Sequence, residues 1–389
     1  MSQGQHPYLA TVPGGLESLL ARELASLGAL EVRARAAGVV GFRATTEVAA
    51  RVCLWSRLAN RLLLPLTDLP AGTPTELGTG VRAIRWERFL RPQGTLAVDF
   101  HGTNGAFRHT RFGAQTVKDA VVDRFRDRCG VRPSVRLDSP DLRISVRLLG
   151  QRAKIGIDLS GRSLHRRGYR LDGGTAPLKE NLAAGILMLA GWPEALAAEA
   201  PFVDPMCGSG TLLVEAAWLA TDRAPGLGRD PGGLGALPGF SPALWEKLQR
   251  EARDRNLAAT LSKHRFLGFD NHPGTVAMAR ENILKAGCAE VITIDCRPLA
   301  SLSPPPGDGT GLLAVNPPYG ERIGEAAHLG KLYRTLGKKL GEEFTGWRTA
   351  ILTANASLRQ TIGLRSLQHF SLFNGAIPCQ LDLFGPEGN

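Results

Sequence analysis

Apolar and polar positions alternate with strand and helix periods through the first 68 residues of the chain. Short apolar runs predict four strands, at Tyr8–Thr11, Leu30–Arg35, Val39–Ala44 and Leu62–Leu66. Leucines spaced three and four residues apart from Leu16 to Leu27 predict a helix, and Thr46 can cap a second one. The order strand, helix, strand, strand, helix, strand predicts a small ferredoxin-like domain over residues 1–68.

A second α+β pattern follows over residues 69–160. After a Pro/Gly-containing link at Pro70–Pro74, the expected elements are helices over Val81–Phe89 and Thr116–Arg128, and strands at Thr95–Phe100, Ser134–Leu137, Leu142–Leu149 and Arg152–Leu159. This order of elements resembles the THUMP domain of RNA-modifying enzymes. The resemblance implies that cations in and before the second helix contact RNA phosphates, namely Arg108, Arg111, Lys118, Arg124 and Arg128.

The remaining chain begins with a strand–turn–helix pattern. The apolar strand Phe202–Asp204 ends in a turn with Gly208 and Gly210, and an apolar helix starts near Thr211. This pattern is typical of the nucleotide-binding unit of doubly wound sheets. It is not a P-loop, because no lysine follows the glycines.

A second turn, Asn316-Pro317-Pro318-Tyr319, ends another buried strand, because the prolines cannot continue a sheet ladder. The Asn316 side-chain oxygen and the Pro317 carbonyl can accept the hydrogens of an exocyclic amine, and Tyr319 can stack on a planar base. These groups suit holding an exocyclic amine and stacking its planar group, and a turn without chemistry is the alternative. Taken together, the two turns resemble those of class I methyltransferases that act on amino nitrogens, and this resemblance favours methyl transfer. Cys207 is not expected to act as a nucleophile, because no base accompanies it.

The composition of the chain bears on its binding partners, on metal sites and on its location in the cell. The 389 residues carry a formal charge of +11, which fits a polyanionic partner such as a nucleic acid, although the charge by itself favours a generally basic surface without a partner. The six cysteines form no Cys-x-x-Cys pair, so neither a zinc site nor a disulfide framework is expected, and no metal. No signal-peptide core or long apolar run is present, so we expect a cytoplasmic protein without a membrane span.

Three runs make a family resemblance specific: Leu164–Arg170 (Leu-His-Arg-Arg-Gly-Tyr-Arg), Ala176–Ala184 and Asp204–Ala217. They look like THUMP-containing RNA guanine-N2 methyltransferases. Ala220–Leu227 and Asn316–Arg322 look most like the N-terminal half of the bacterial bifunctional enzyme that methylates guanines of 23S ribosomal RNA. The resemblance implies a class I, Rossmann-like α/β methyltransferase domain with a seven-stranded sheet over residues 161–389. It also implies S-adenosylmethionine as methyl donor, with S-adenosylhomocysteine as product.

The resemblance and the motifs together assign site residues. Asn316, Pro317 and Tyr319 are the expected catalytic residues. Asp270, at a strand end, would accept both ribose hydroxyls of the cofactor, and Asp295 its adenine amino group. The other expected cofactor residues are Pro177, Leu178, Asp204, Met206, Cys207, Gly208, Ser209, Gly210, Thr211, Asn271, Cys296 and Asn316 itself. RNA would be contacted by Pro318, by the five cations above, and by Arg166 and Arg167 as a phosphate clamp.

Several alternatives stay open at this level. Because the chain ends at Asn389, the second half of the bifunctional enzyme is absent, and a tRNA substrate is an alternative to 23S rRNA. Adenine-N6 methylation of DNA, glutamine methylation of release factors and a non-catalytic RNA-binding or assembly role are the rivals. The insertion at 222–262 is either a lid or RNA-contacting element, or a decoration. Glu321 and Arg322 either form an ion pair or contact RNA. We expect the protein to be a monomer or a weak dimer.

Overall fold

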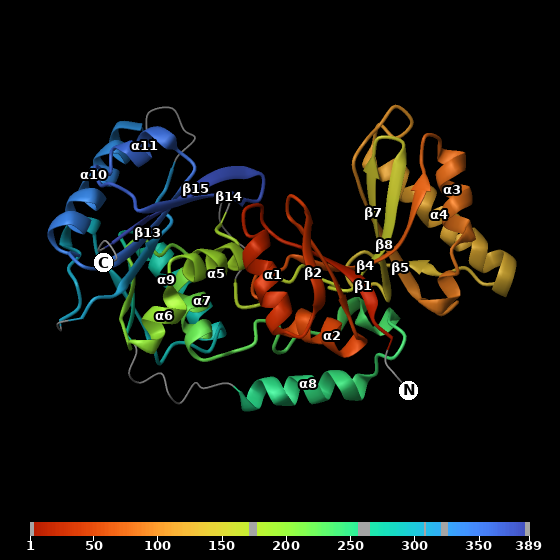
Figure 1. The fold of residues 1–389 in the computed structure, drawn as a ribbon, viewed down its shortest axis with the longest axis horizontal. Helices are drawn as coiled ribbons and strands as arrows, with labels where there is room; N and C mark the ends of the chain where they lie inside the picture. The colour runs from red at the N-terminus through yellow and green to blue at the C-terminus, as the bar shows by residue number, and fades with distance from the viewer. Residues whose placement is uncertain (1–3, 171–176, 256–264, 307–308, 320–325, 386–389) are drawn as a thin grey trace. The chain divides into compact units, whose positions relative to one another are not determined.

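Two sheets organise the chain, one of eight strands and one of seven (Figure 1). The computed structural model describes residues 4–170, 177–255, 265–306, 309–319 and 326–385. The chain divides into a first unit of Met1–Val12, Leu20–Leu164 and Gly226–Glu251, and a second of Pro13–Leu19, His165–Pro225 and Ala252–Asn389.

The eight-stranded sheet belongs to the first unit and has the order β2-β3-β1-β4-β8-β7-β5-β6. Its strands are β1 (His6–Thr11), β2 (Leu30–Ala36), β3 (Val39–Ala44), β4 (Arg61–Pro70), β5 (Thr95–His101), β6 (Ser134–Val135), β7 (Leu142–Leu149) and β8 (Arg152–Asp158). Antiparallel pairing of β4 with β8 joins the regions predicted as ferredoxin-like and THUMP domains into one continuous sheet. The pairing is possible because β4 extends four residues beyond the strand expected from its apolar run.

Helices pack against this sheet: α2 (Thr46–Trp55), α3 (Pro74–Ala83) and α4 (Thr110–Cys129). The expected helix over Val81–Phe89 is wrong. The helix instead begins at Pro74, where Thr73 and Glu76 form a capping box, and only a 3-10 turn, Trp86–Arg88, falls in the predicted range. The side chain of Thr45, rather than that of Thr46, caps α2.

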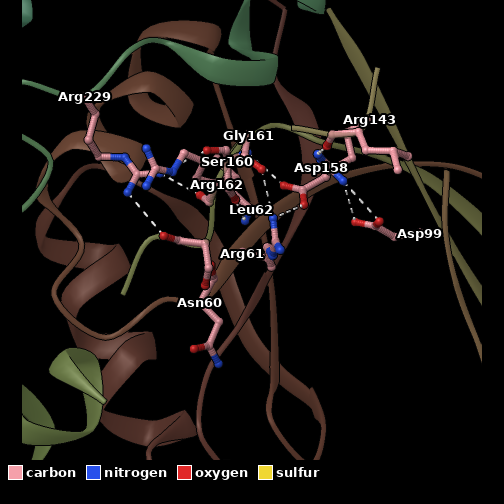
Figure 2. A network of polar contacts seen from close by, with 12 residues as sticks. Asn60, Arg61, Leu62, Asp99, Arg143, Asp158, Ser160, Gly161, Arg162 and Arg229 are labelled. Carbon is pink, nitrogen blue, oxygen red and sulfur yellow. Dashed lines mark hydrogen bonds and ion pairs between the residues drawn. The ribbon is translucent and has the colours of Figure 1, made fainter. Parts of the chain in front are cut away.

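Most of the insertion packs on the first unit. It contains a 3-10 turn, Gly232–Ala236, and helix α8 (Pro242–Asp254). The Arg229 guanidinium donates hydrogen bonds to the carbonyls of Ser160, Arg162 and Ser163 at 3.1, 2.6 and 3.2 Å. Figure 2 shows Arg229 at one side of this network and the buried Asp158, which pairs with Arg61 at 2.8 Å, at the other. The part of the insertion at Gly226–Glu251 therefore packs as an element of the first unit. Its predicted role as a lid, an RNA-contacting element or a decoration stays a prediction.

The seven-stranded sheet belongs to the second unit and has the order β11-β10-β9-β12-β13-β15-β14. Its strands are β9 (Phe202–Asp204), β10 (Phe266–Asp270), β11 (Ile292–Cys296), β12 (Leu312–Val315), β13 (Arg348–Thr353), β14 (Gln368–Asn374) and β15 (Ile377–Phe384). The first five are parallel, and β15 is antiparallel to both β13 and β14. The five parallel strands form a doubly wound arrangement, and the hairpin of β14 and β15 completes the sheet at one edge.

The helices of the second unit are α5 (Glu180–Leu189), α6 (Trp192–Ala197), α7 (Thr211–Ala220), α9 (Pro273–Lys285), α10 (Ala326–Glu342) and α11 (Ala356–Gln360), and α1 (Glu17–Ser26) begins there. A buried apolar cluster joins β9, β12 and β13 to α10, with Tyr333 and Leu336 fully buried in it. Within the described ranges, no helix has the length and apolar composition needed to cross a membrane.

Candidate active site

Two carboxylates end neighbouring parallel strands of the second unit. Asp204 closes β9, and Asp270 lies two residues beyond its register partner, Gly268, on β10. Parallel strands place their carboxyl ends at one edge of the sheet, where doubly wound folds bind ligands. The two aspartates singled out from the sequence therefore lie at the same edge.

The turn after β9 is held by its neighbours on every side. The Cys207 N–H donates to the Phe269 carbonyl at 2.8 Å, and the Gly208 N–H donates to Asp270 Oδ2 at 3.1 Å. The buried Asn282 on α9 donates from Nδ2 to the Ser209 carbonyl at 3.0 Å. Gly208 and Gly210 have φ of +53° and +80°, a conformation that favours glycine. The turn is thus preorganised at the N-terminus of α7, where backbone N–H groups attract negative or electron-rich groups.

Asp204 is buried, with 2% of its surface exposed. Burial raises its pKa to about 8, opposed by a hydrogen bond from the Met206 N–H, and the charge of Asp270 raises it further. Burial is also the main reason why the pKa of the neighbouring Cys207 thiol is raised. The raised pKa disfavours the thiolate, which is the nucleophilic form of cysteine.

The Asn-Pro-Pro-Tyr turn follows β12, which pairs with β9 in the same sheet. Pro317 is buried, Pro318 is exposed and Tyr319 is half-buried. The Asn316 Oδ1 atom is buried and accepts no hydrogen bond from the described residues. A buried polar atom without a partner costs free energy, so the fold maintains an acceptor that a ligand can satisfy.

The basic segment Leu164–Arg170 forms internal pairs rather than an open clamp. Arg167 is paired with Glu215 at 3.2 Å, and their side chains are 1% and 0% exposed. The Arg167 guanidinium is therefore not presented to solvent, and its predicted phosphate contact stays a prediction. Arg166 is exposed.

Arg170 links this segment to the glycine turn. Its Nη2 donates to Thr211 Oγ1 at 2.7 Å and to the Leu178 carbonyl at 2.8 Å, and Thr211 Oγ1 contacts Ser209 Oγ at 3.1 Å. Glu180 lies beside Arg170 and pairs with His165 at 3.1 Å. Burial raises the pKa of Glu180, but His165 and Arg170 outweigh this effect and leave that pKa lowered.

The other predicted cofactor residues are arranged around the same strand ends. Leu178 is buried and Pro177 is exposed, and Met206 packs against the apolar cluster of α10. Asn271 and Cys296 are exposed next to the ends of β10 and β11. Asp295 is 40% exposed and pairs with Arg297 at 2.9 Å, so its carboxylate already has a partner.

The predicted RNA-contacting cations of the first unit differ in their surroundings. Arg108, Arg111 and Arg128 are exposed on or next to α4. Lys118 pairs with Asp119, and Arg124 pairs with Glu87 at 2.8 Å and donates to the Arg82 carbonyl. Arg124 is therefore held in the packing of α3 and α4 rather than presented to solvent.

Sequence reasoning missed two residues that position the turn, Arg170 and Asn282. Asn282 had a signal, because it is the polar residue on the apolar face formed by Val276, Ala279 and Ile283. Arg170 had no distinguishing signal among its basic neighbours. Glu321 and Arg322 lie outside the described residues, and no cluster of metal-binding side chains occurs among those that are described.

Comparison with known protein families assigns the second unit, which carries these strand ends, to a methyltransferase domain. A family described as "RMKL-like, methyltransferase domain" matches residues 167–382. The chain belongs to this methyltransferase family. A THUMP domain matches residues 72–158, and an RlmL ferredoxin-like domain matches residues 7–63.

Two curated relatives carry the name ribosomal RNA large subunit methyltransferase K/L. The protein from Methylococcus capsulatus is 49% identical over 97% of this chain, and the alignment covers 51% of that relative. The protein from Syntrophotalea carbinolica is 46% identical over 96% of this chain and 53% of the relative. The chain therefore spans about half the length of these relatives.

Solved structures share the whole fold. A putative methyltransferase complexed with S-adenosylhomocysteine has a TM-score of 0.86 at 30% identity, covering 100% of both chains. A predicted N6-adenine-specific DNA methylase from Listeria monocytogenes has a TM-score of 0.83 at 28% identity, covering 98% of this chain and 97% of the other.

Proposed function

We propose that the chain is an S-adenosylmethionine-dependent enzyme that methylates N2 of a guanine in structured RNA, with 23S rRNA as the expected substrate. The proposal rests on two features at the same edge of the seven-stranded sheet. Among the described residues, the buried Asn316 Oδ1 atom has no hydrogen-bond donor, and the glycine turn after Asp204 is held in place by Asp270. The ribosomal RNA in the names of the relatives, and the THUMP match, support the choice of RNA.

We also propose the finer assignments made from the sequence. These are domains at 1–68, 69–160 and 161–389, and correspondence to the N-terminal half of the bifunctional rRNA methyltransferase. The cytoplasmic location, the monomer-or-weak-dimer state and the absence of a metal stay predictions.

The residues fit the cofactor chemically. S-adenosylmethionine is cationic, and when bound it supplies an electrophilic methyl group. Two carboxylates at one sheet edge favour a cation, and ionisation of Asp204 becomes easier when positive charge lies beside it. Gly208 contributes no side chain, and a Cβ added there would meet no atom within 4 Å, so the turn has room beside it. Asp270 would accept from ribose hydroxyls, while the Gly208 N–H holds its carboxylate.

The reaction needs an exposed amino group held in position. Asn316 Oδ1 and the Pro317 carbonyl would accept the two hydrogens of the guanine amine, orienting its nitrogen for in-line attack. Tyr319 would stack on the base, which must be unpaired to enter. The methylated nitrogen then loses its proton to water or a weak acceptor, because positive charge on that nitrogen makes the proton acidic.

Asn316→Ala tests the proposal. The interaction with the amine strengthens as charge develops on the nitrogen, so the variant should transfer labelled methyl to RNA about 10²–10³-fold more slowly in single turnover. Cofactor affinity, measured separately by calorimetry, should barely change. A folded variant that methylates at the wild-type rate would contradict the role of Asn316. Identification of the product as N6-methyladenosine in DNA, rather than N2-methylguanosine in RNA, would favour the alternative suggested by the Listeria structure.

A further inference from the structure

The first unit carries a groove across one face of its eight-stranded sheet. Side chains alternate along each strand: Tyr8 and Ala10 are buried, whereas Leu9 between them is half-buried on the opposite face. A cavity of about 830 Å³ lies over that second face, lined by residues of β1, β2, β3, β4, β7 and β8. We call this feature the sheet groove.

The floor of the sheet groove is apolar. Leu9 on β1 lies directly opposite Leu63 on β4, and Pro65 on β4 lies opposite Gly156 on β8. Gly41 on β3 lies opposite Leu9. The Arg35 side chain passes over Gly41 so closely that an added Cβ would come within 2.9 Å of Arg35 Nε. Leu9, Leu63 and Pro65 are half-buried on this face of the sheet. Their apolar surface can pack against the flat, uncharged face of a nucleobase.

Cations border this floor at both ends. Arg35 and Arg43 lie on β2 and β3, and Arg147 on β7 lies directly opposite Lys154 on β8. Within the described part of the chain, Arg35, Arg147 and Lys154 have no carboxylate at ion-pair distance. The lining also holds two acidic residues. Asp68 lies directly opposite Lys154 in the β4–β8 register but pairs with Arg152 at 2.8 Å, and Glu31 lies 3.9 Å from Arg43.

The middle of helix α4 differs in this respect, whereas the predicted RNA contacts Arg108, Arg111 and Arg128 at its two ends are exposed. Its Lys118, Arg124 and Arg126 each pair with a carboxylate, and Asp127 pairs with Arg82 of α3. Neutralised cations contribute little to phosphate binding, because a competing carboxylate must first be displaced. The sheet groove therefore offers more uncompensated charge than the middle of this helix.

We infer that the sheet groove binds a short unpaired stretch of RNA, with bases on the Leu9–Leu63–Pro65 floor and phosphates near Arg35, Arg147 and Lys154. The inference rests on the proposed RNA methylation, and it names where part of that substrate lies. A duplex hides its bases and would present phosphates to an apolar floor, which costs desolvation. A single strand can place bases inward and phosphates outward.

The test compares two double variants of the full chain that remove the same charge. Arg147→Gln with Lys154→Gln alters the groove, and Arg82→Gln with Arg126→Gln alters the paired surface of α3 and α4. Binding of a fluorescent ten-nucleotide oligouridine is measured over a range of salt concentrations. The groove variant should lower the salt slope by about 1.4, from about 0.7 per contact, and the control variant by much less. Circular dichroism checks that both variants are folded.

Photocross-linking gives a second measurement that does not depend on variants. Oligonucleotides containing 4-thiouridine should cross-link to peptides from β1, β4 or β8 of the wild-type protein, and a matched duplex should compete poorly. Cross-links confined to α4 or to the second unit would overturn the inference, as would equal salt slopes in the two double variants. Unchanged RNA binding in the groove variant would also overturn the inference, and a protein would then be the alternative occupant of the sheet groove. Groove-dependent RNA binding without methyl transfer by the wild type would instead contradict the proposed function while supporting the groove.

Discussion

Asp270 accepts a hydrogen bond from the backbone N–H of Gly208 at 3.1 Å, across 62 residues of sequence. The same carboxylate accepts from the His272 N–H at 3.0 Å through its other oxygen, so both oxygens are oriented by backbone donors. The pair ties the end of β10 to the glycine turn after β9. It fixes the proposed ribose acceptor before any ligand arrives.

Asp270→Ala removes this acceptor. Loss of two hydrogen bonds to the cofactor should weaken S-adenosylmethionine binding by on the order of 2–3 kcal/mol. Isothermal calorimetry measures the change, with Glu281→Ala as a control, because Glu281 is an exposed acid on α9. Equal affinity in the two folded variants would remove Asp270 from the cofactor site.

Asp204 should make the stability of the ligand-free protein depend on pH. Its pKa is about 8 in the fold against an ordinary 3.8, so the folded state retains a proton that the unfolded chain has released. Stability therefore falls as the pH rises from about 4 to about 8, by at most about 1.4 kcal/mol per pH unit. Asp204→Asn removes this contribution, and its free energy of unfolding should fall less between pH 5 and 8. Urea unfolding of the second unit measures this, with the exposed Glu290→Gln as control, and parallel curves for Asp204→Asn and wild type would refute it.

Arg170 is hydrogen-bonded to Thr211 and to the Leu178 carbonyl, and we expect it to position the glycine turn. Arg170→Leu removes donors to Thr211 and to the Leu178 carbonyl, so the turn should open more often and cofactor affinity should fall roughly tenfold. Arg170→Lys should restore little, because an ammonium lacks the planar fork that reaches both acceptors. Hydrogen exchange of the Gly208–Thr211 amides distinguishes positioning from direct binding. Unchanged exchange rates beside a lost affinity would indicate direct contact with the cofactor.

Arg229 should stabilise the first unit. Arg229→Ala leaves the carbonyls of Ser160, Arg162 and Ser163 without this donor, which should cost about 2–4 kcal/mol. Limited proteolysis should then cut more readily within Gly226–Glu251. Arg250→Ala, which removes an exposed arginine of α8, is the matched control and should resemble wild type. Resistance to protease equal to wild type would mean that Arg229 does not anchor the insertion.

The sequence alone determined the elements of the second unit and the residues at its strand ends. Its signals are local: an apolar strand running into Asp204, two glycines before Thr211, and two prolines that stop a strand after Asn316. Turn chemistry and strand period are properties of a few consecutive residues, so they can be read without the fold. The capping box at Thr73 was equally local, yet its helix was missed because the apolar residues nearby suggested a later start.

Only the tertiary structure decided which polar groups have partners. Arg166 and Arg167 are neighbours in a basic run, but Arg167 is buried against Glu215, 48 residues away, because the fold brings α7 beside it. Likewise, Leu63 on β4 and Arg147 on β7 both line the sheet groove, although they are far apart in the sequence. Sheet register and ion pairing depend on long-range packing, and no local pattern of residues encodes them.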